Sequence, residues 1–200
     1  MKKYLTKFLF VFLCSLCYIS SILGQTSRPT HGISFSYFND QLLKPGARVG
    51  YEFPAWDRLE EKGTNKSTIK EFVVKINVGF HTHKRNSTAV YVNATIGYRL
   101  TTNAGLIIEP LHIGTGYMYS FLGANTYSVE NSTIRRIKKA GNSAFLTPYL
   151  SLIGLGYDFR KKQNLPFSAY FSIDPYLRYP VNTKTKLTLS VPVGFTYFFK

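Results

Sequence analysis

Cysteine is almost absent from this 200-residue sequence, and its two copies, Cys14 and Cys17, both lie close to the N-terminus. The rest of the chain has no thiol, which excludes disulfide bonds and thiolate metal sites there. Each cysteine follows a leucine, whereas a bacterial lipoprotein signal needs a small residue at that position. Stability must therefore come from buried apolar surface or from closure of a sheet.

Long hydrophobic runs are also scarce, because the only uncharged apolar run of any length covers residues 8–23. The run follows a charged leader made of Lys2, Lys3 and Lys7. Gly24 is a small residue suited to cleavage before Gln25, so the pattern is that of a secretory signal peptide. A membrane anchor is the alternative, but the run is short and lacks a stop-transfer flank. We expect a signal peptide over 1–24 and a single domain over 25–200.

Acidic residues are few, with 10 Asp and Glu against 25 Lys and Arg, and the formal net charge is +15. Aromatic residues make up 16% of the chain, far too many for a disordered basic tail. A basic chain can bind nucleic acid, but an exported one meets anionic lipid head groups first. We therefore expect outer-membrane lipid as a partner and no nucleic acid. A simpler explanation is that the excess cations keep loops solvated.

Helical periodicity is missing as well, and apolar residues instead recur at every second position between turn residues. The segments with this pattern are 32–38, 47–53, 72–80, 90–100, 106–121, 144–159, 167–179 and 187–199. Sequential strands of this kind predict an all-β fold, a closed antiparallel up-and-down barrel of about eight strands. The phase slips near Pro110, where we expect a β-bulge, and again within 144–159.

The final stretch shows the alternation most clearly. One face carries Leu187, Leu189, Val191, Val193, Phe195, Tyr197 and Phe199, and the other is small and mostly polar. The stretch resembles the C-terminal closing strand of bacterial outer-membrane barrels, in which a terminal aromatic residue is the assembly signal. Here Lys200 follows the last aromatic residue.

Alternation alone does not say which face points outward. A lipocalin-like soluble barrel puts the apolar face inside, and a membrane barrel puts it outside. Strands of roughly ten residues and aromatic residues at strand ends favour a transmembrane barrel. The opposite face carries charges of both signs, which we expect to form a polar network in the lumen: Arg48, Glu52, Lys75, Arg99, Asp174 and Arg178. On a soluble barrel the same side chains would form the solvated surface.

Two connections are long, namely 55–70 and 122–142, and both are predicted to be loops. With both termini in the periplasm, 122–142 faces outside, as long loops do. The connection 55–70 then becomes a periplasmic turn, although such turns are usually short. Either the flanking strands extend into it, or the strand count is wrong by one.

The segments GLIIEP, GTGYMYSFLG and LIGLGYDF, together with the aromatic final strand, resemble small porin-like outer-membrane β-barrel proteins of Bacteroidetes-type bacteria. The resemblance covers the chain after the leader and implies location in the cell outer membrane. It carries no catalytic signature, and we expect neither a cofactor nor an enzymatic activity.

Candidate chemical sites are weak. His81 and His83 share a strand face but lack a third metal ligand at matching spacing, and no G-x-S-x-G motif supports Ser87 as a nucleophile. The densest basic run is Arg135, Arg136, Lys138 and Lys139. It is either a site for lipopolysaccharide phosphates or an ordinary solvated loop.

The sequence thus predicts a structural or accessory membrane protein whose exposed loops bind lipid or a protein partner. The alternatives are a narrow porin-like channel for small solutes, a soluble periplasmic binder of a hydrophobic ligand, and a lipid-modifying enzyme. Because eight strands leave little bore, we expect no general porin conductance.

Overall fold

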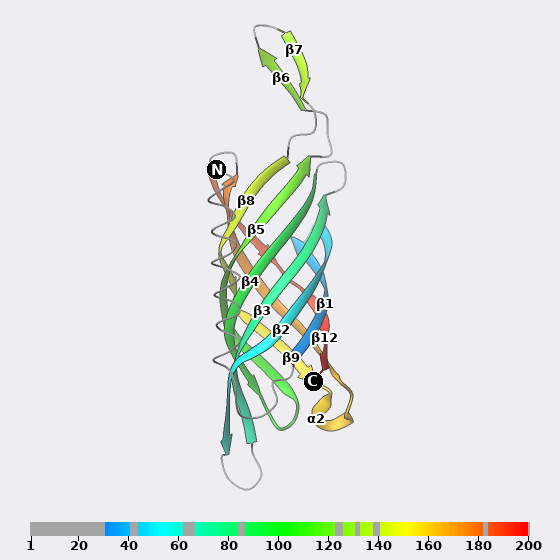
Figure 1. The fold of residues 1–200 in the computed structure, drawn as a ribbon, viewed down its shortest axis with the longest axis vertical. Helices are drawn as coiled ribbons and strands as arrows, with labels where there is room; N and C mark the ends of the chain where they lie inside the picture. Colours follow the sequence, from blue (N-terminus) through cyan, green and yellow to red (C-terminus); the bar gives the residue numbers. More distant parts are fainter. Residues whose placement is uncertain are drawn as a thin grey trace, which may run out of the picture.

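The computed structural model describes residues 31–40, 44–61, 67–83, 87–122, 126–130, 133–137, 141–181 and 184–199 (Figure 1). Its long strands are β1 (His31–Asp40), β2 (Lys44–Glu61), β3 (Ser67–His83), β4 (Ser87–Thr101), β5 (Leu106–Leu122) and β10 (Phe167–Val181). The shorter strands are β6 (Thr126–Glu130), β7 (Thr133–Ile137), β8 (Gly141–Ser151), β9 (Ile153–Asp158), β11 (Lys184–Ser190) and β12 (Val193–Phe199). One short helix, α2 (Arg160–Gln163), lies between β9 and β10. Within the described ranges, no helix is long and apolar enough to cross a membrane.

The strands form a closed antiparallel ring. β8 and β9 are two halves of one barrel strand interrupted at Leu152, and β11 and β12 are two halves of another, interrupted at 191–192. β1 pairs with β2 on one side and with β12 on the other, so the first and last strands meet and the ring of eight closes. The predicted closed up-and-down barrel of about eight strands is confirmed.

The apolar faces of the strands point away from the interior. Ile96, Phe171 and Val193 are 51%, 41% and 54% exposed, respectively. β4 alternates between exposed and buried side chains along most of its length, with Tyr91 and Asn93 among the buried ones. The predicted polarity, apolar outside and polar inside, is therefore what the fold adopts.

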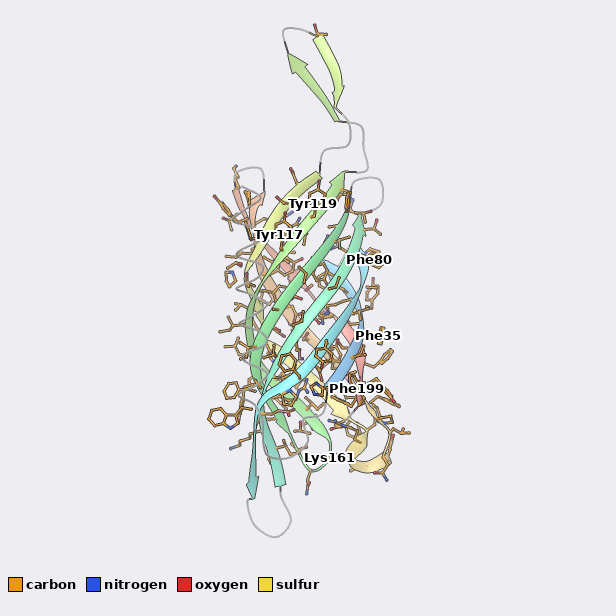
Figure 2. All side chains as sticks on the ribbon, viewed as in Figure 1. Phe35, Phe80, Tyr117, Tyr119, Lys161 and Phe199 are labelled. Carbon is orange, nitrogen blue, oxygen red and sulfur yellow. The ribbon has the colours of Figure 1, made fainter. Side chains whose placement is uncertain are left out.

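Aromatic side chains gather toward both ends of the barrel wall. Figure 2 shows Tyr117, Tyr119 and Phe80 toward the end that carries β6 and β7, called the upper end below, and Phe199 toward the other, lower end. Ring contacts link neighbouring strands, as between Tyr117 and Phe145, whose centroids are 5.6 Å apart. Such belts are typical of side chains that sit at a membrane–water interface.

Within the predicted loop 55–70, residues 55–61 belong to β2 and residues 67–70 to β3, contrary to the sequence prediction. β2 continues to Glu61 and β3 begins at Ser67, and the two strands stay paired out to these residues. They form a ribbon that projects from the lower end of the barrel (Figure 1). The conflict over the strand count is thereby resolved, because the flanking strands extend into the supposed loop. Charged residues at successive positions in the sequence, such as Glu60 and Glu61, removed the period-two signal, although the backbone pairing persists.

The β-bulge predicted near Pro110 is confirmed. Tyr98 pairs with Leu111 and Leu100 with Ile108, so β5 has one more residue than β4 between these pairs. Glu109 and His112 are three positions apart and would lie on opposite faces of a regular strand. Because of the extra residue, both side chains are buried in the interior.

The other irregular stretches depart further from the prediction. The segment 122–142 contains the β6–β7 hairpin, which extends beyond the upper end of the barrel (Figure 1). The slip within 144–159 is present as the break at Leu152. Leu146, expected on the outer face, is 1% exposed and points inward. The cause is that β8 has an extra residue relative to β5, since Gly114 pairs with Tyr149 but Gly116 with Leu146.

Candidate functional site

The lower half of the interior holds an ionic network centred on Arg99 of β4. Its Nη1 and Nη2 donate to the two carboxylate oxygens of Glu52 at 3.1 and 2.9 Å. Its Nε donates to Glu109 Oε1 at 2.7 Å. All of these side chains are buried, and the fork geometry matches the planar guanidinium to the carboxylate.

Lys75 of β3 completes this network from the neighbouring strand. Its Nζ lies 2.6 Å from Glu109 Oε2 and 3.9 Å from Glu52 Oε2. Glu71 lies 3.5 Å from Arg99, and His112 Nε2 lies 3.5 Å from Glu109. Each of the two cations thus contacts at least two carboxylates, which compensates for removing these charges from water.

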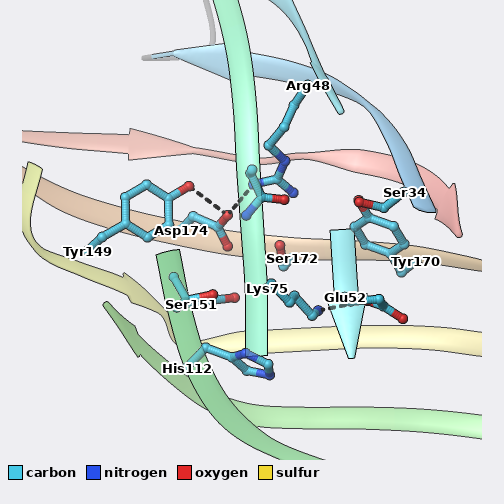
Figure 3. Close-up of a pocket in the computed structure, with 12 residues that line it drawn as sticks. Ser34, Arg48, Glu52, Lys75, His112, Tyr149, Ser151, Tyr170, Ser172 and Asp174 are labelled. Atoms are coloured by element: carbon cyan, nitrogen blue, oxygen red, sulfur yellow. Dashed lines mark hydrogen bonds and ion pairs between the residues drawn. The ribbon is translucent and has the colours of Figure 1, made fainter. Parts of the chain in front are cut away.

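A second network spans the interior from β2 to β10. Arg48 Nη1 lies 3.2 Å from Asp174 Oδ2, and the Tyr149 hydroxyl donates to the same oxygen at 3.0 Å. Arg48 Nε also donates to Ser36 Oγ at 3.0 Å. Figure 3 shows Arg48 and Tyr149 approaching Asp174 from different strands. The ion pair therefore ties together walls that are not neighbours in the sheet.

A cavity of about 20 Å³ lies between the two networks, with room on the order of one water molecule. Asp174, Lys75 and His112 are among its lining residues (Figure 3). Among the side chains that the structure describes, Asp174 Oδ1 and both His112 ring nitrogens have no hydrogen-bond partner. Buried polar atoms of this kind are usually satisfied by ordered water, so the cavity suits water rather than a larger ligand.

An apolar cluster fills the interior next to the second network. It consists of Phe38, Ala89, Tyr91, Met118, Leu146, Tyr149 and Tyr176. The Tyr149 and Tyr176 rings stack with centroids 5.2 Å apart, and Phe38 lies 4.9 Å from Tyr91. Phe38 is near the upper end of β1 and Ala89 near the upper end of β4, so the cluster lies above the ionic networks. Buried His81 lies beside the Phe38 and Tyr91 rings, so the side chains at this level are closely packed.

The sequence predicts part of this apolar cluster, because small residues on the interior face allow Tyr91 to pack across the lumen; the side chains that Tyr91 meets there were not predicted. Tyr91 and Met118 are bulky residues on faces otherwise classed as polar, and they pair directly across β4 and β5. Tyr91 packs over Gly79 of β3, where an added Cβ would lie 2.6 Å from the Tyr91 Cζ atom. A large side chain opposite a glycine is the pattern that marks such packing across a narrow lumen.

The lower end of the interior is covered by Arg160 from α2. Its Nε and Nη2 donate to the Asp158 carboxylate at 2.9 and 2.8 Å. The guanidinium lies 3.5 Å from the centroid of the Phe198 ring. Asp158 and Phe198 are both buried, so this cation–π contact closes the interior beside the final strand.

Five of the six residues predicted for the lumen network lie in the two ionic networks, and Arg178 lies elsewhere. Arg48, Glu52, Lys75, Arg99 and Asp174 all line the interior and take part in the two networks. Arg178 is half-buried on β10 opposite Leu146 and Lys186, closer to the upper end.

The basic run and the two histidines singled out in the sequence form no chemical site among the described residues. Arg135 and Arg136 belong to β7, whereas Lys138 and Lys139 lie outside the described residues. His81 is buried, with the Phe38 ring 6.1 Å and the Tyr91 ring 6.5 Å away. In the described part of the chain, no three His, Cys, Asp or Glu side chains gather as metal ligands. His83 pairs with Ser87 across β3 and β4, but no described carboxylate is hydrogen-bonded to His83.

Comparisons with known proteins identify no family for this chain. The sequence matches no protein-family profile and no curated protein. Similar solved structures include Ail, the attachment invasion locus protein of Yersinia pestis, at 12% identity and a TM-score of 0.43, covering 86% of this chain and 99% of Ail. The outer membrane enzyme PagL has 9% identity and a TM-score of 0.47, over 83% of this chain and 98% of PagL. Neisserial surface protein A has 9% identity and a TM-score of 0.42, over 86% and 96%. These values assign neither a ligand nor an activity.

Proposed function

We propose that the chain is an outer-membrane β-barrel protein with a closed interior, which acts as a structural or accessory scaffold and binds partners through its upper end. One observation carries the proposal, namely a barrel wall that is apolar outside and ionic inside. The longest connection between barrel strands, 123–140, leaves the upper end, and long connections of such barrels face the cell exterior. The lower end then faces the periplasm.

The outer wall requires lipid because its apolar area is continuous around the ring. Each strand of the ring contributes an exposed apolar side chain: Phe35, Val49, Val78, Val92, Ile113, Phe145, Phe171 and Phe195. Soluble monomers rarely expose apolar patches larger than a few hundred Å². A lipocalin-like soluble binder needs the opposite arrangement, with these side chains around an internal ligand, so that alternative is not favoured.

The interior argues against the narrow-channel alternative. Two ion-pair networks occupy its lower and middle parts, and the apolar cluster fills the part above them. Ions would have to displace buried, paired charges and then pass between closely packed rings, such as Phe38 against Tyr91 and Tyr149 against Tyr176. A scaffold role needs no open path.

Partner binding is assigned to the upper end on the basis of charge. Arg135 and Arg136 lie on β7 of the projecting hairpin, and Lys138 and Lys139 follow in the sequence. Such a run offers charge-assisted hydrogen bonds to lipopolysaccharide phosphates or to an acidic protein partner. The expected lack of an enzymatic activity, the resemblance to Bacteroidetes-type barrels and cleavage after Gly24 stay predictions.

The membrane placement is tested with Trp56, the only tryptophan in the chain. Trp56 is 70% exposed on β2 near the lower aromatic residues, where it would sit at the head-group level. The protein is folded into vesicles that contain lipids brominated either near the head group or near the chain ends. We expect strong quenching of Trp56 fluorescence by the shallow bromines and weak quenching by the deep ones.

A parallel gel assay makes the result decisive. A folded barrel in detergent should migrate faster before boiling than after it, because the closed sheet resists unfolding. Absence of quenching by either lipid, together with release in aqueous buffer without detergent, would overturn the proposal in favour of a soluble barrel.

A further inference from the structure

The connection between β9 and β10 at the lower end has a feature that the scaffold role does not use. Residues 159–166 contain the single turn of α2 and present two adjacent exposed cations, Lys161 and Lys162. Figure 2 shows Lys161 at the lower end of the molecule, below the barrel wall. Leu165 follows at 40% exposure, so the turn carries an apolar side chain beside its charges.

The turn is held in place by its first cation rather than by the lysines. Asp158 accepts from the Arg160 backbone N at 3.0 Å and from its guanidinium, which also covers Phe198. The charge of Arg160 is thus used internally. In the described residues no ion pair joins Lys161 or Lys162 to a carboxylate, so both charges remain available to a ligand outside the chain.

An aromatic shelf sets the depth of the turn relative to the barrel wall. Phe159 contacts Tyr157 and Phe167, with ring centroids 5.1 Å apart in both cases. These rings lie directly before and after the turn, at the lower limit of the apolar wall. A basic pair immediately beyond an interfacial aromatic shelf lies at the level of lipid phosphates, within reach of long lysine side chains.

We propose that Lys161 and Lys162 form a binding site for the phosphate of an anionic phospholipid in the periplasmic leaflet, with Leu165 entering the acyl boundary. The site rests on the proposed membrane placement. Lysines near an anionic surface attract it by Coulomb forces, and the fixed backbone of the turn lowers the entropy lost on binding. A lipid is favoured over a protein partner because the turn continues the lipid-facing wall through the aromatic shelf.

The test uses a fluorescent donor placed in the turn. Gln163→Cys is labelled in a background carrying Cys14→Ser and Cys17→Ser, so that the label has a single attachment point. The protein is folded into phosphatidylcholine vesicles that contain a trace of acceptor-labelled phosphatidylglycerol or acceptor-labelled phosphatidylcholine. We expect more energy transfer to phosphatidylglycerol than to phosphatidylcholine.

Matched charge removals then locate the site. Lys161→Ser/Lys162→Ser should lower the preference for phosphatidylglycerol by about fivefold for each lysine. The control Lys184→Ser/Lys186→Ser removes the same charge from exposed positions on β11, toward the opposite end, and should leave the preference unchanged. Equal transfer to both lipids, or the same loss in both double variants, overturns the site.

The design separates two kinds of failure. If the protein folds into the vesicles and Trp56 is quenched, equal transfer to both lipids refutes only the phospholipid site. If the protein remains outside the vesicles, the membrane placement itself is wrong.

Discussion

At the scale of single residues, the interior is organised by charges that face each other across neighbouring strands. Glu52 pairs with Lys75, and Glu71 with Arg99, as direct register partners. The β5 bulge then brings Glu109 into the same group. The sequence predicted that Arg48, Glu52, Lys75, Arg99 and Asp174 face the lumen, because their strand phase was clear. It did not predict which charges meet, because pairing depends on register and on bulges.

Arg99 is the residue on which this group depends most. Arg99→Met removes the donor shared by Glu52 and Glu109 and leaves buried carboxylates with fewer partners. We expect the free energy of unfolding to fall by about 3–5 kcal/mol, the usual cost of breaking a buried pair. Urea unfolding in vesicles, followed by Trp56 fluorescence, measures the change.

Two comparisons sharpen that measurement. Lys186→Met changes an exposed cation on β11 and should shift the unfolding free energy by less than about 0.5 kcal/mol. Glu52→Gln combined with Arg99→Met should cost less than the sum of the single changes, since the partners act together. A loss below about 1 kcal/mol for Arg99→Met would mean that water, rather than the arginine, satisfies these carboxylates.

At the scale of elements, apolar alternation predicted a strand wherever one face met the outer wall. It succeeded for β4 and for the final strand, and it located the bulge near Pro110. It failed for the β2–β3 ribbon and for Leu146. The ribbon projects beyond the apolar wall, so no face has to be apolar there. Leu146 is displaced inward by an extra residue in β8; the sequence predicted a slip within 144–159 but not its position beside Leu146.

The projecting ribbon should be dispensable for the barrel. Beyond the Gly32–Glu52 pair, β2 has no described partner except β3, and trimming past Arg58 removes few barrel pairs. Replacing residues 59–69 by Asn-Gly joins Arg58 to Lys70 through a two-residue hairpin turn. We expect the heat-modifiable gel shift to persist, with an unfolding free energy within about 1 kcal/mol of the parent.

The same deletion has an informative opposite outcome. Loss of the fast-migrating folded band would show that the ribbon helps the ring to close. A deletion of residues 193–199, which removes the strand paired with β1, should abolish the band and provides the reference for failed closure.

At the scale of the whole molecule, the interior is layered along the barrel axis. Arg160 covers the lower end, the ionic networks fill the lower and middle parts, and the apolar cluster lies above them. The sequence predicted a filled interior from the strand number alone. It did not predict the layers, because the cluster also joins strands far apart in the chain, such as β1 with Phe38 and β10 with Tyr176.

This layering predicts that the barrel does not conduct. In planar bilayers the parent protein should give no stable open state, with a general porin as the positive control. Tyr91→Ala/Met118→Ala opens the apolar layer and should increase brief openings, whereas Val92→Ala on the outer wall should not. Large, steady currents from the parent protein would contradict the closed interior.

The meeting of β1 with β12 also governs how such a molecule can be made. No part of the ring can be completed until its last strand has been synthesised, because that strand supplies the seam. Until then, the apolar side chains of the outer wall are exposed to water in the periplasm, where they can associate with those of other chains. The order of synthesis therefore imposes a need for a holding chaperone during transit, and a delay at the seam should appear as aggregation rather than as a half-built pore.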